Sequence, residues 1–472
     1  MDENKKIIPL RNTIFSQDIV SSLNREYLAI MIRENTKVIC INKNAGKKRN
    51  MPFKALYENN NRFWLQDSAW EYFIEADEFA GIKEKAASGH YIPESKMEAE
   101  EEPEVLSDES ELGFGKEADV ILSMTIPEQV NKIEENKSKL NDLIVNKTKD
   151  PAIVTEALVE TTKDAALINH AVLMNAMKAG DDEAKKITQT IVTSTTEMVK
   201  ASVQLVTDDI FDNELMAALV QKSNGTIVQH MTRVYLCGIS FLAFYNKLVS
   251  TSSIINKLRI SFNGRYRNYY HTLIPNVDME DLSLEHVFYK GMRSIPAEIF
   301  TQWAVGFLIH DIGKAGAVEY HEGEAAYNRD IVVEHVKLGY TSVMNKTSYP
   351  REAGLITGYH HEYYGDSSGY GYFRTYLEQY KKANPKARQD YCITYELEPM
   401  LDFIALAYFP AKVLEIIDVY DSVTDPNRKY HKAMKPEEAL SMMREEFIVK
   451  KQKIDPVLFD IFETFIKGKL KT

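Results

Sequence analysis

The chain has 472 residues, about two or three times the length of a typical domain, so it predicts more than one folding unit. Hydrophobic residues make up 44% and charged residues 27%, the proportions of an ordered globular protein rather than a disordered or membrane-embedded one. The net charge of −12 argues against a protein that binds duplex nucleic acid, because such proteins neutralise phosphates with a broad basic face.

The N-terminus and the cysteines predict a reduced, cytoplasmic protein. The opening residues MDENKKIIPLRN contain no apolar leader, and no stretch approaches the roughly eighteen apolar residues of a membrane span. Three cysteines, at positions 40, 237 and 392, are widely spaced and form no CxxC pair. A disulfide framework and a thiolate zinc site are therefore not expected.

Residues 1–90 predict a small N-terminal α/β or β-containing domain of unknown function. Short apolar runs such as KVICIN at 37–42 alternate with turn-rich pieces such as NAGKKRN at 44–50. Residues 91–120 are acidic and poor in apolar side chains, which is typical of a solvated linker. What the N-terminal domain would sense is not readable from its sequence.

Residues 121–208 predict a helical linker or bundle. Thr125 and Glu128 have the spacing of a capping box, and apolar residues follow at helical intervals. Pro151 is suited to open a second helix that Gly180 closes, and a third is expected over about 182–206. Three interpretations stay open: a linker bundle, a dimerising stalk, or the first part of a catalytic domain.

Residues 209–472 predict an all-helical domain that carries most of the histidines. Nine of the eleven histidines lie at or after position 230. Five of them, with two aspartates, form a candidate metal-ligand set: His230, His310, Asp311, His335, His360, His361 and Asp418.

Seven nitrogen and oxygen ligands suit two divalent metal ions, with positions left for water and phosphate. We expect Asp311 to bridge the ions, because its neighbour His310 can hold one ion while the short carboxylate reaches both. The pair follows the apolar run WAVGFLI and is expected to be buried. A single histidine on an apolar helix is more often a hydrogen-bonded core residue. The combination of a His-Asp pair, a later histidine, a double histidine and a later aspartate favours the metal interpretation.

The order of these motifs resembles the HD superfamily and, within it, the HD-GYP phosphodiesterases, over roughly residues 211–465. His230 with Arg233 and Val234 is similar to the opening H-x-x-R-V element, and HDIGK at 310–314 matches the signature. HHEYYGDSSGYGY, which begins at His360, is similar to the double-histidine segment that leads to the GYP triplet. IIDVYDSVT, which begins at Ile416, is similar to the family's last motif.

The resemblance implies an all-helical domain with two or three metal ions, and Thr226 in place of a glutamate ligand favours two. Iron or manganese is favoured, and zinc or nickel is also compatible with histidine and carboxylate ligands. It implies hydrolysis of cyclic di-GMP to pGpG, GMP or both, in bacterial second-messenger signalling. Asp311 and Lys314 would be catalytic, with Lys314 on the phosphate, and Arg428 and Lys432 would contact the nucleotide. Tyr370 could stack on guanine, since aromatic faces bind bases without specific hydrogen bonds, or it could pack within its own loop.

Three departures leave the substrate open. The triplet reads Gly369-Tyr370-Gly371, without the proline; Thr226 stands where members with three metals have glutamate; and residues 373–399 form an insertion that we expect to be a lid or surface segment. The alternatives are an HD hydrolase of another nucleotide or phosphoester, and a catalytically silent receptor of cyclic di-GMP. A homodimer and a signalling partner bound through the GYG loop also stay open.

Overall fold

A computed structural model of the chain describes residues 7–9, 30–31, 36–42, 47–53, 70–87, 120–121, 123–148, 150–177, 179–207, 227–251, 253–314, 329–365, 369–372, 389–425 and 433–470. The chain divides into two compact units, residues 1–107 with 320–323, and residues 108–319 with 324–472. Apart from Val120, the predicted linker at 91–120 lies outside the described residues. The predicted domain boundaries therefore stay predictions.

The first unit contains a small antiparallel sheet, as the short apolar runs predicted. Its strands are β1 (Ile7–Pro9), β2 (Lys37–Asn42), β3 (Lys48–Pro52) and β4 (Trp70–Glu75), in the order β1-β4-β2-β3. In the register of the two central strands, Ile39 is opposite Phe73. The strands are followed by α4 (Ala76–Ala87), whose Phe79 and Ile82 are buried.

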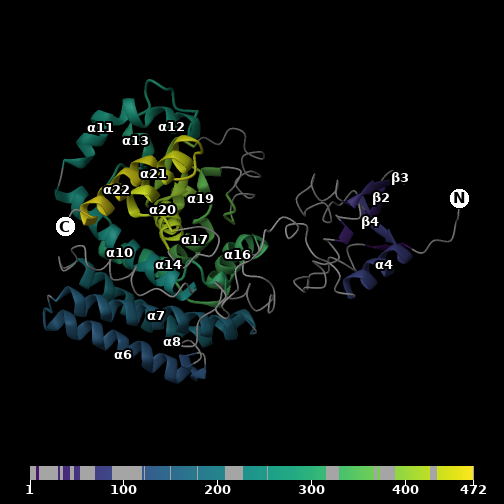
Figure 1. Cartoon of the computed structure of the whole chain (residues 1–472), viewed down its shortest axis with the longest axis horizontal. Helices are drawn as coiled ribbons and strands as arrows, with labels where there is room; N and C mark the ends of the chain where they lie inside the picture. Colours follow the sequence, from purple (N-terminus) through teal and green to yellow (C-terminus); the bar gives the residue numbers. More distant parts are fainter. Residues whose placement is uncertain are drawn as a thin grey trace. The chain divides into compact units, whose positions relative to one another are not determined.

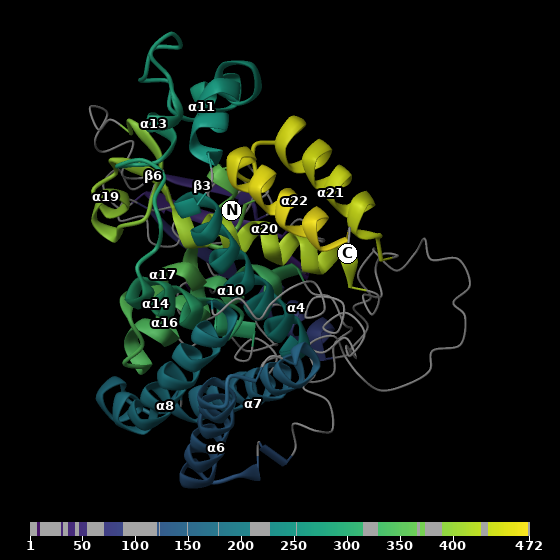
Figure 2. The same ribbon diagram turned by 90° about the vertical axis from the view of Figure 1, so that its left-hand side faces the viewer.

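The second unit is mostly helical, and its elements follow one another as shown in Figures 1 and 2. They are α6 (Ile126–Val145), α7 (Pro151–Met177), α8 (Asp181–Thr207), α10 (Ile227–Thr251), α11 (Ile254–Arg265), α12 (Arg267–Leu273), α13 (Leu284–Val287), α14 (Ala297–Leu308), α16 (Arg329–Lys346), α17 (Arg351–Tyr359), the 3-10 turn η3 (Tyr363–Gly365), β5 (Tyr391–Thr394), α19 (Leu397–Leu401), β6 (Ala405–Tyr408), α20 (Phe409–Thr424), α21 (Pro436–Arg444), the π-turn η4 (Glu445–Val449) and α22 (Pro456–Leu470).

The three long helices α6, α7 and α8 belong to the same packed unit as the histidine-bearing helices. The predicted capping box is confirmed, because the backbone N–H of Thr125 donates to the Glu128 carboxylate over 2.7 Å. Both α7 and α8 pack against α10 and α16, and α8 also packs against α14. In Figures 1 and 2 the three helices lie together on one side of the unit. The three helices are therefore part of one compact unit with the helices that carry the candidate ligands.

Polar contacts hold the C-terminal end of α16 against α7 and α8. Lys346 Nζ donates to the carbonyl of Ala179 over 2.6 Å and pairs with Asp181 at 2.8 Å. The hydroxyl of Tyr349, just beyond α16, donates to the side-chain oxygen of the buried Asn169. The helix that carries His335 is therefore anchored at its far end.

Within its described residues, the second unit departs from the expected all-helical domain at one place. Strands β5 and β6 form a two-stranded parallel sheet, with Ile393 opposite Ala407, and Phe288 forms an isolated bridge to Ile393. Cys392 and Thr394 are fully buried. Parallel strands need cover on both faces, so this end of the predicted insertion is core rather than a surface lid. The rest of the insertion, residues 373–388, lies outside the described residues.

Among the described residues, no helix has the length and apolar character that a membrane crossing requires.

Candidate metal centre

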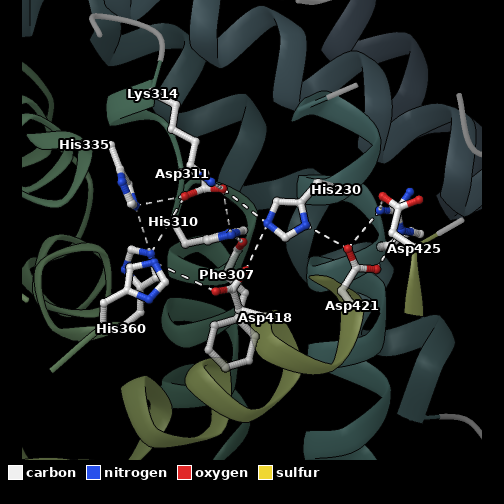
Figure 3. Close-up of polar contacts among 12 residues, drawn as sticks. His230, Phe307, His310, Asp311, Lys314, His335, His360, Asp418, Asp421 and Asp425 are labelled. Atoms are coloured by element: carbon white, nitrogen blue, oxygen red, sulfur yellow. Dashed lines mark hydrogen bonds and ion pairs between the residues drawn. The ribbon is translucent and has the colours of Figure 1, made fainter. Parts of the chain in front are cut away.

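Five helices bring the seven predicted ligands to one buried place. His230 lies on α10, His335 on α16 and Asp418 on α20, while His310 and Asp311 follow α14 and the double histidine follows α17. Each of these seven residues is at most 8% exposed. Figure 3 shows His335 and His360 on one side of Asp311 and His230 on the other.

The ligands form two groups that Asp311 joins. One group is His335, His360 and His361, and the other is His230, His310 and Asp418; within each group the ligand atoms lie within 4.8 Å of one another. Oδ1 of Asp311 lies 3.1 Å from Nε2 of His335, and Oδ2 lies 3.3 Å from Nε2 of His230. The two oxygens of one carboxylate therefore face different groups, which is the geometry of a bridging ligand.

The spacing of the ligand atoms fits metal coordination. Metal–nitrogen bonds of about 2.0–2.1 Å place neighbouring ligand atoms of one ion roughly 3.0–3.4 Å apart. Nε2 of His230 lies 3.0 Å from Oδ1 of Asp418, and Nε2 of His335 lies 3.3 Å from Nε2 of His360. These buried histidine and aspartate groups could therefore hold metal ions.

Hydrogen bonds to the backbone orient two of the imidazoles. Nδ1 of His310 donates to the carbonyl of Phe307 over 2.9 Å, and Nδ1 of His360 donates to the carbonyl of Thr357 over 2.8 Å. A proton on Nδ1 leaves the Nε2 lone pair available to a metal. His230 Nε2, His310 Nε2 and Asp311 Oδ1 are buried and make no hydrogen bond. Such unmet polar atoms are costly, and a bound cation would satisfy them.

The protonation states of most ligands suit a cation. Burial lowers the pKa of His310 to about 4, and it also lowers the pKa of His335 and His361, so these imidazoles are neutral near pH 7. Burial alone would raise the pKa of Asp311, but Lys314 and His310 outweigh this effect and lower the pKa to well below its usual value. Neutral imidazoles and ionised carboxylates are the forms that bind metals.

His230 is the exception, because the negative charge around it raises its pKa. Burial lowers its pKa, but the neighbouring carboxylates of Asp311, Asp418 and Asp421 raise the value to about 10. Without a metal ion the imidazole therefore carries a proton on both ring nitrogens and is positively charged. The three carboxylates favour positive charge at this point, and a divalent ion at Nε2 would supply it in place of the proton.

A second layer of buried charges holds His230 in place. Its Nδ1 donates to Oδ2 of Asp421 over 2.7 Å, and Arg233 donates to both oxygens of the same carboxylate over 2.6 and 2.9 Å. Arg233 also donates to Asp425 over 2.5 Å. The sequence prediction omitted Asp421. Its spacing was the available signal, because it lies three residues after Asp418 and so on the same face of α20.

Two glycines let the signature turn approach α16. A Cβ atom at Gly313 would overlap the backbone carbonyl of His335 and the backbone nitrogen of Gly339. A Cβ atom at Gly339 would in turn meet the side chain of Thr357. The glycine of HDIGK therefore allows the backbone contact that brings His335 within reach of Asp311.

The predicted substrate contacts have different outcomes. Lys314 forms an ion pair with Asp311 at the edge of the centre, with its side chain 15% exposed. The ring of Tyr370 lies 4.3 Å from the ring of His361, at an interplanar angle of 32°. Arg428 and Lys432 lie outside the described residues.

Comparison with known proteins adds little to this geometry. No family model matches the chain, and no curated protein shows significant similarity to it. Among solved structures, Bd1817, an HDG"Y"P protein from Bdellovibrio bacteriovorus, is similar at 11% identity and a TM-score of 0.29, over 92% of this chain and 95% of that chain. Similarity at this level does not assign the chain to a family.

Proposed function

We propose that this chain is a metal-dependent phosphodiesterase that hydrolyses cyclic di-GMP to pGpG, to GMP or to both. The proposed ligands are His230, His310, Asp311, His335, His360, His361 and Asp418, and they would hold two divalent ions. The observation that carries the proposal is the position of Asp311, whose two oxygens lie 3.1 and 3.3 Å from ligand atoms of different groups.

When bound, two divalent ions supply Lewis acidity and a water nucleophile that is active near neutral pH. The protein's own contribution is to fix the positions and protonation states of the ligands. Hydrogen bonds from Nδ1 hold His310 and His360, and Asp421 holds His230. Lys314 lies next to Asp311, where its ammonium group would offset charge that develops on a phosphate.

The choice of cyclic di-GMP rests on the resemblance of the motifs. HDIGK begins at His310, the GYG triplet at Gly369 and IIDVYD at Ile416, in the order of the HD-GYP phosphodiesterases. The chain has a net charge of −12, so a polyanionic dinucleotide would depend on local positive charge. Metal ions with Lys314, Arg428 and Lys432 would supply it.

The test is a turnover assay on the full chain loaded with Mn²⁺ or Fe²⁺, with cyclic di-GMP, a mononucleotide and a simple phosphodiester as substrates. We expect cleavage of cyclic di-GMP, and loss of that cleavage in Asp311→Ala. The matched control is Asp402→Ala, since Asp402 is an exposed aspartate outside the centre. Cleavage of the other substrates alone would indicate a different HD hydrolase. Binding of cyclic di-GMP without turnover would indicate a silent receptor.

A further inference from the structure

Residues 369–372 run alongside the double histidine and are hydrogen-bonded to it. The backbone N–H groups of Tyr370 and Gly371 both donate to the carbonyl of His361, over 2.9 and 3.1 Å. The N–H of Tyr372 donates to the carbonyl of Gly358, over 2.9 Å. The 369–372 segment is therefore fixed to the end of α17 by three backbone hydrogen bonds.

His361 is held differently from the other two oriented ligands. His310 and His360 each donate from Nδ1 to a backbone carbonyl, over 2.9 and 2.8 Å. The Nδ1 of His361 has a longer contact, 3.4 Å to the hydroxyl of Tyr363. A bond of that length orients an imidazole weakly. Packing of the ring therefore has a larger part in setting the direction of its Nε2.

Tyr370 supplies much of that packing. Its ring centroid lies 4.3 Å from that of His361, and 6.3 Å from those of His335 and Tyr363. On the same imidazole, the ring of His360 lies 4.0 Å away. Nε2 of His361 points toward Asp418, with 3.8 Å between the nitrogen and Oδ2. The tyrosine ring thus lies against the ligand itself.

Gly371 allows the segment to approach this closely. A Cβ atom at Gly371 would overlap the carboxyl end of Glu362, which is only 6% exposed. Proline, the third residue of the triplet that the sequence resembles, has a ring at this point and no N–H group for the carbonyl of His361. The glycine at this position therefore leaves room for the Glu362 side chain and provides the N–H group that donates to the carbonyl of His361.

We propose that Tyr370 is a positioning residue that directs His361 toward the metal centre, rather than a surface on which guanine stacks. Gly371 is the residue that lets the 369–372 segment hold Tyr370 there. This inference rests on the proposed function, since it assumes that His361 is a metal ligand. The Gly369-Tyr370-Gly371 triplet would then help to build the metal centre rather than contact the substrate.

The test compares Tyr370→Ala, Tyr370→Phe and Gly371→Pro in the full chain, with Tyr372→Ala as the matched control. Tyr372 lies in the same segment, but its ring stacks on Tyr340 at 5.1 Å. The probes are Co²⁺ affinity, the Co²⁺ absorption spectrum, and separate kcat and KM values for cyclic di-GMP. We expect Tyr370→Ala and Gly371→Pro to weaken one of two Co²⁺ sites by about 10- to 100-fold and to change the spectrum. Tyr370→Phe and Tyr372→Ala should resemble the wild type.

Two results would overturn the inference. One is a Tyr370→Ala protein with unchanged Co²⁺ affinity and spectrum and a raised KM, as expected for a base-stacking residue. The other is a Tyr370→Phe protein as impaired as Tyr370→Ala, which would place the role in the hydroxyl. A wild-type chain that binds fewer than two ions contradicts the proposed function instead. In that case the packing can still be tested by NMR on the metal-free proteins. The ring current of Tyr370 should shift the His361 resonance in the wild type, and this shift should be lost in Tyr370→Ala.

Discussion

Nδ1 of His230 and Oδ2 of Asp421 lie 2.7 Å apart, although 191 residues separate them in the sequence. The same carboxylate accepts two hydrogen bonds from Arg233, one turn after His230 on α10. The imidazole is thereby turned so that Nε2 faces Asp311 and Asp418 (Figure 3). A carboxylate behind a histidine ligand fixes the ring and raises its basicity.

Asp421→Asn is expected to weaken metal binding without changing any ligand. The amide can accept fewer hydrogen bonds than the carboxylate and carries no charge, so both His230 and Arg233 lose part of their support. We expect metal affinity to fall by about 10- to 100-fold, as measured by competition with a chelator. Asp402→Asn is the control, because Asp402 is exposed. Unchanged affinity in Asp421→Asn would show that the ring is held by other contacts.

Gly313→Ala is expected to destabilise the protein and to separate His335 from Asp311. Its methyl group would meet backbone atoms of His335 and Gly339, which cannot rotate away as a side chain can. Overpacking of this kind costs about 1–3 kcal/mol, and a backbone contact places it at the upper end. The free energy of unfolding from denaturant titration measures the loss.

The control for this substitution is Gly264→Ala. Gly264 lies in α11, and a Cβ atom there would have no neighbour within 4 Å. Alanine is the better helix former, so we expect stability to stay the same or to rise by up to about 1 kcal/mol. Equal losses in the two variants would contradict the close approach of the signature turn to α16.

Glu415 is expected to make the stability of the metal-free protein depend on pH. It is fully buried on α20 beside Lys412, and its Oε1 accepts the backbone N–H of Tyr363 over 3.2 Å. Burial raises its pKa from 4.5 to about 7, although Lys412 lowers it in part. Because the folded-state pKa is the higher one, the fold favours the protonated form. Stability should therefore fall as the pH rises from about 4.5 to about 7.

Glu415→Gln isolates this contribution because glutamine does not titrate. A shift of this size corresponds to about 3 kcal/mol. The difference in unfolding free energy, variant minus wild type, should therefore rise by that amount between pH 4.5 and pH 8. Chemical denaturation of both metal-free proteins across this range measures it. A difference that stays flat with pH would show that Glu415 is ionised throughout.

The positions of four candidate ligands follow a local pattern that the sequence displays. His310 and Asp311 come just after the apolar helix α14, and His360 and His361 come directly after α17. The capping box at Thr125 is equally local and is confirmed. The two groups of candidate ligands meet around Asp311 because five helices pack together. The order of the motifs indicated this arrangement only through the resemblance to a known family.

The contacts between distant segments could not be predicted. The pairing of Arg233 with Asp421 and Asp425 joins α10 to the end of α20. No local sequence pattern indicates that these distant residues are in contact. The strand Tyr391–Thr394 is too short for its period to separate it from a loop. Stacking on a base and packing within its loop were both open for Tyr370, and only the fold places its ring against His361.

The metal content of the purified full chain tests the central claim most directly. After loading with Mn²⁺ or Fe²⁺ and removal of excess ion, we expect two ions per chain in the wild type. Asp311→Asn, which alters the carboxylate between the two groups, should retain fewer than one tightly bound ion, while Asp402→Asn should retain two. A wild-type chain that binds no ion, or an Asp311→Asn chain that keeps both, would contradict a dinuclear centre bridged by Asp311.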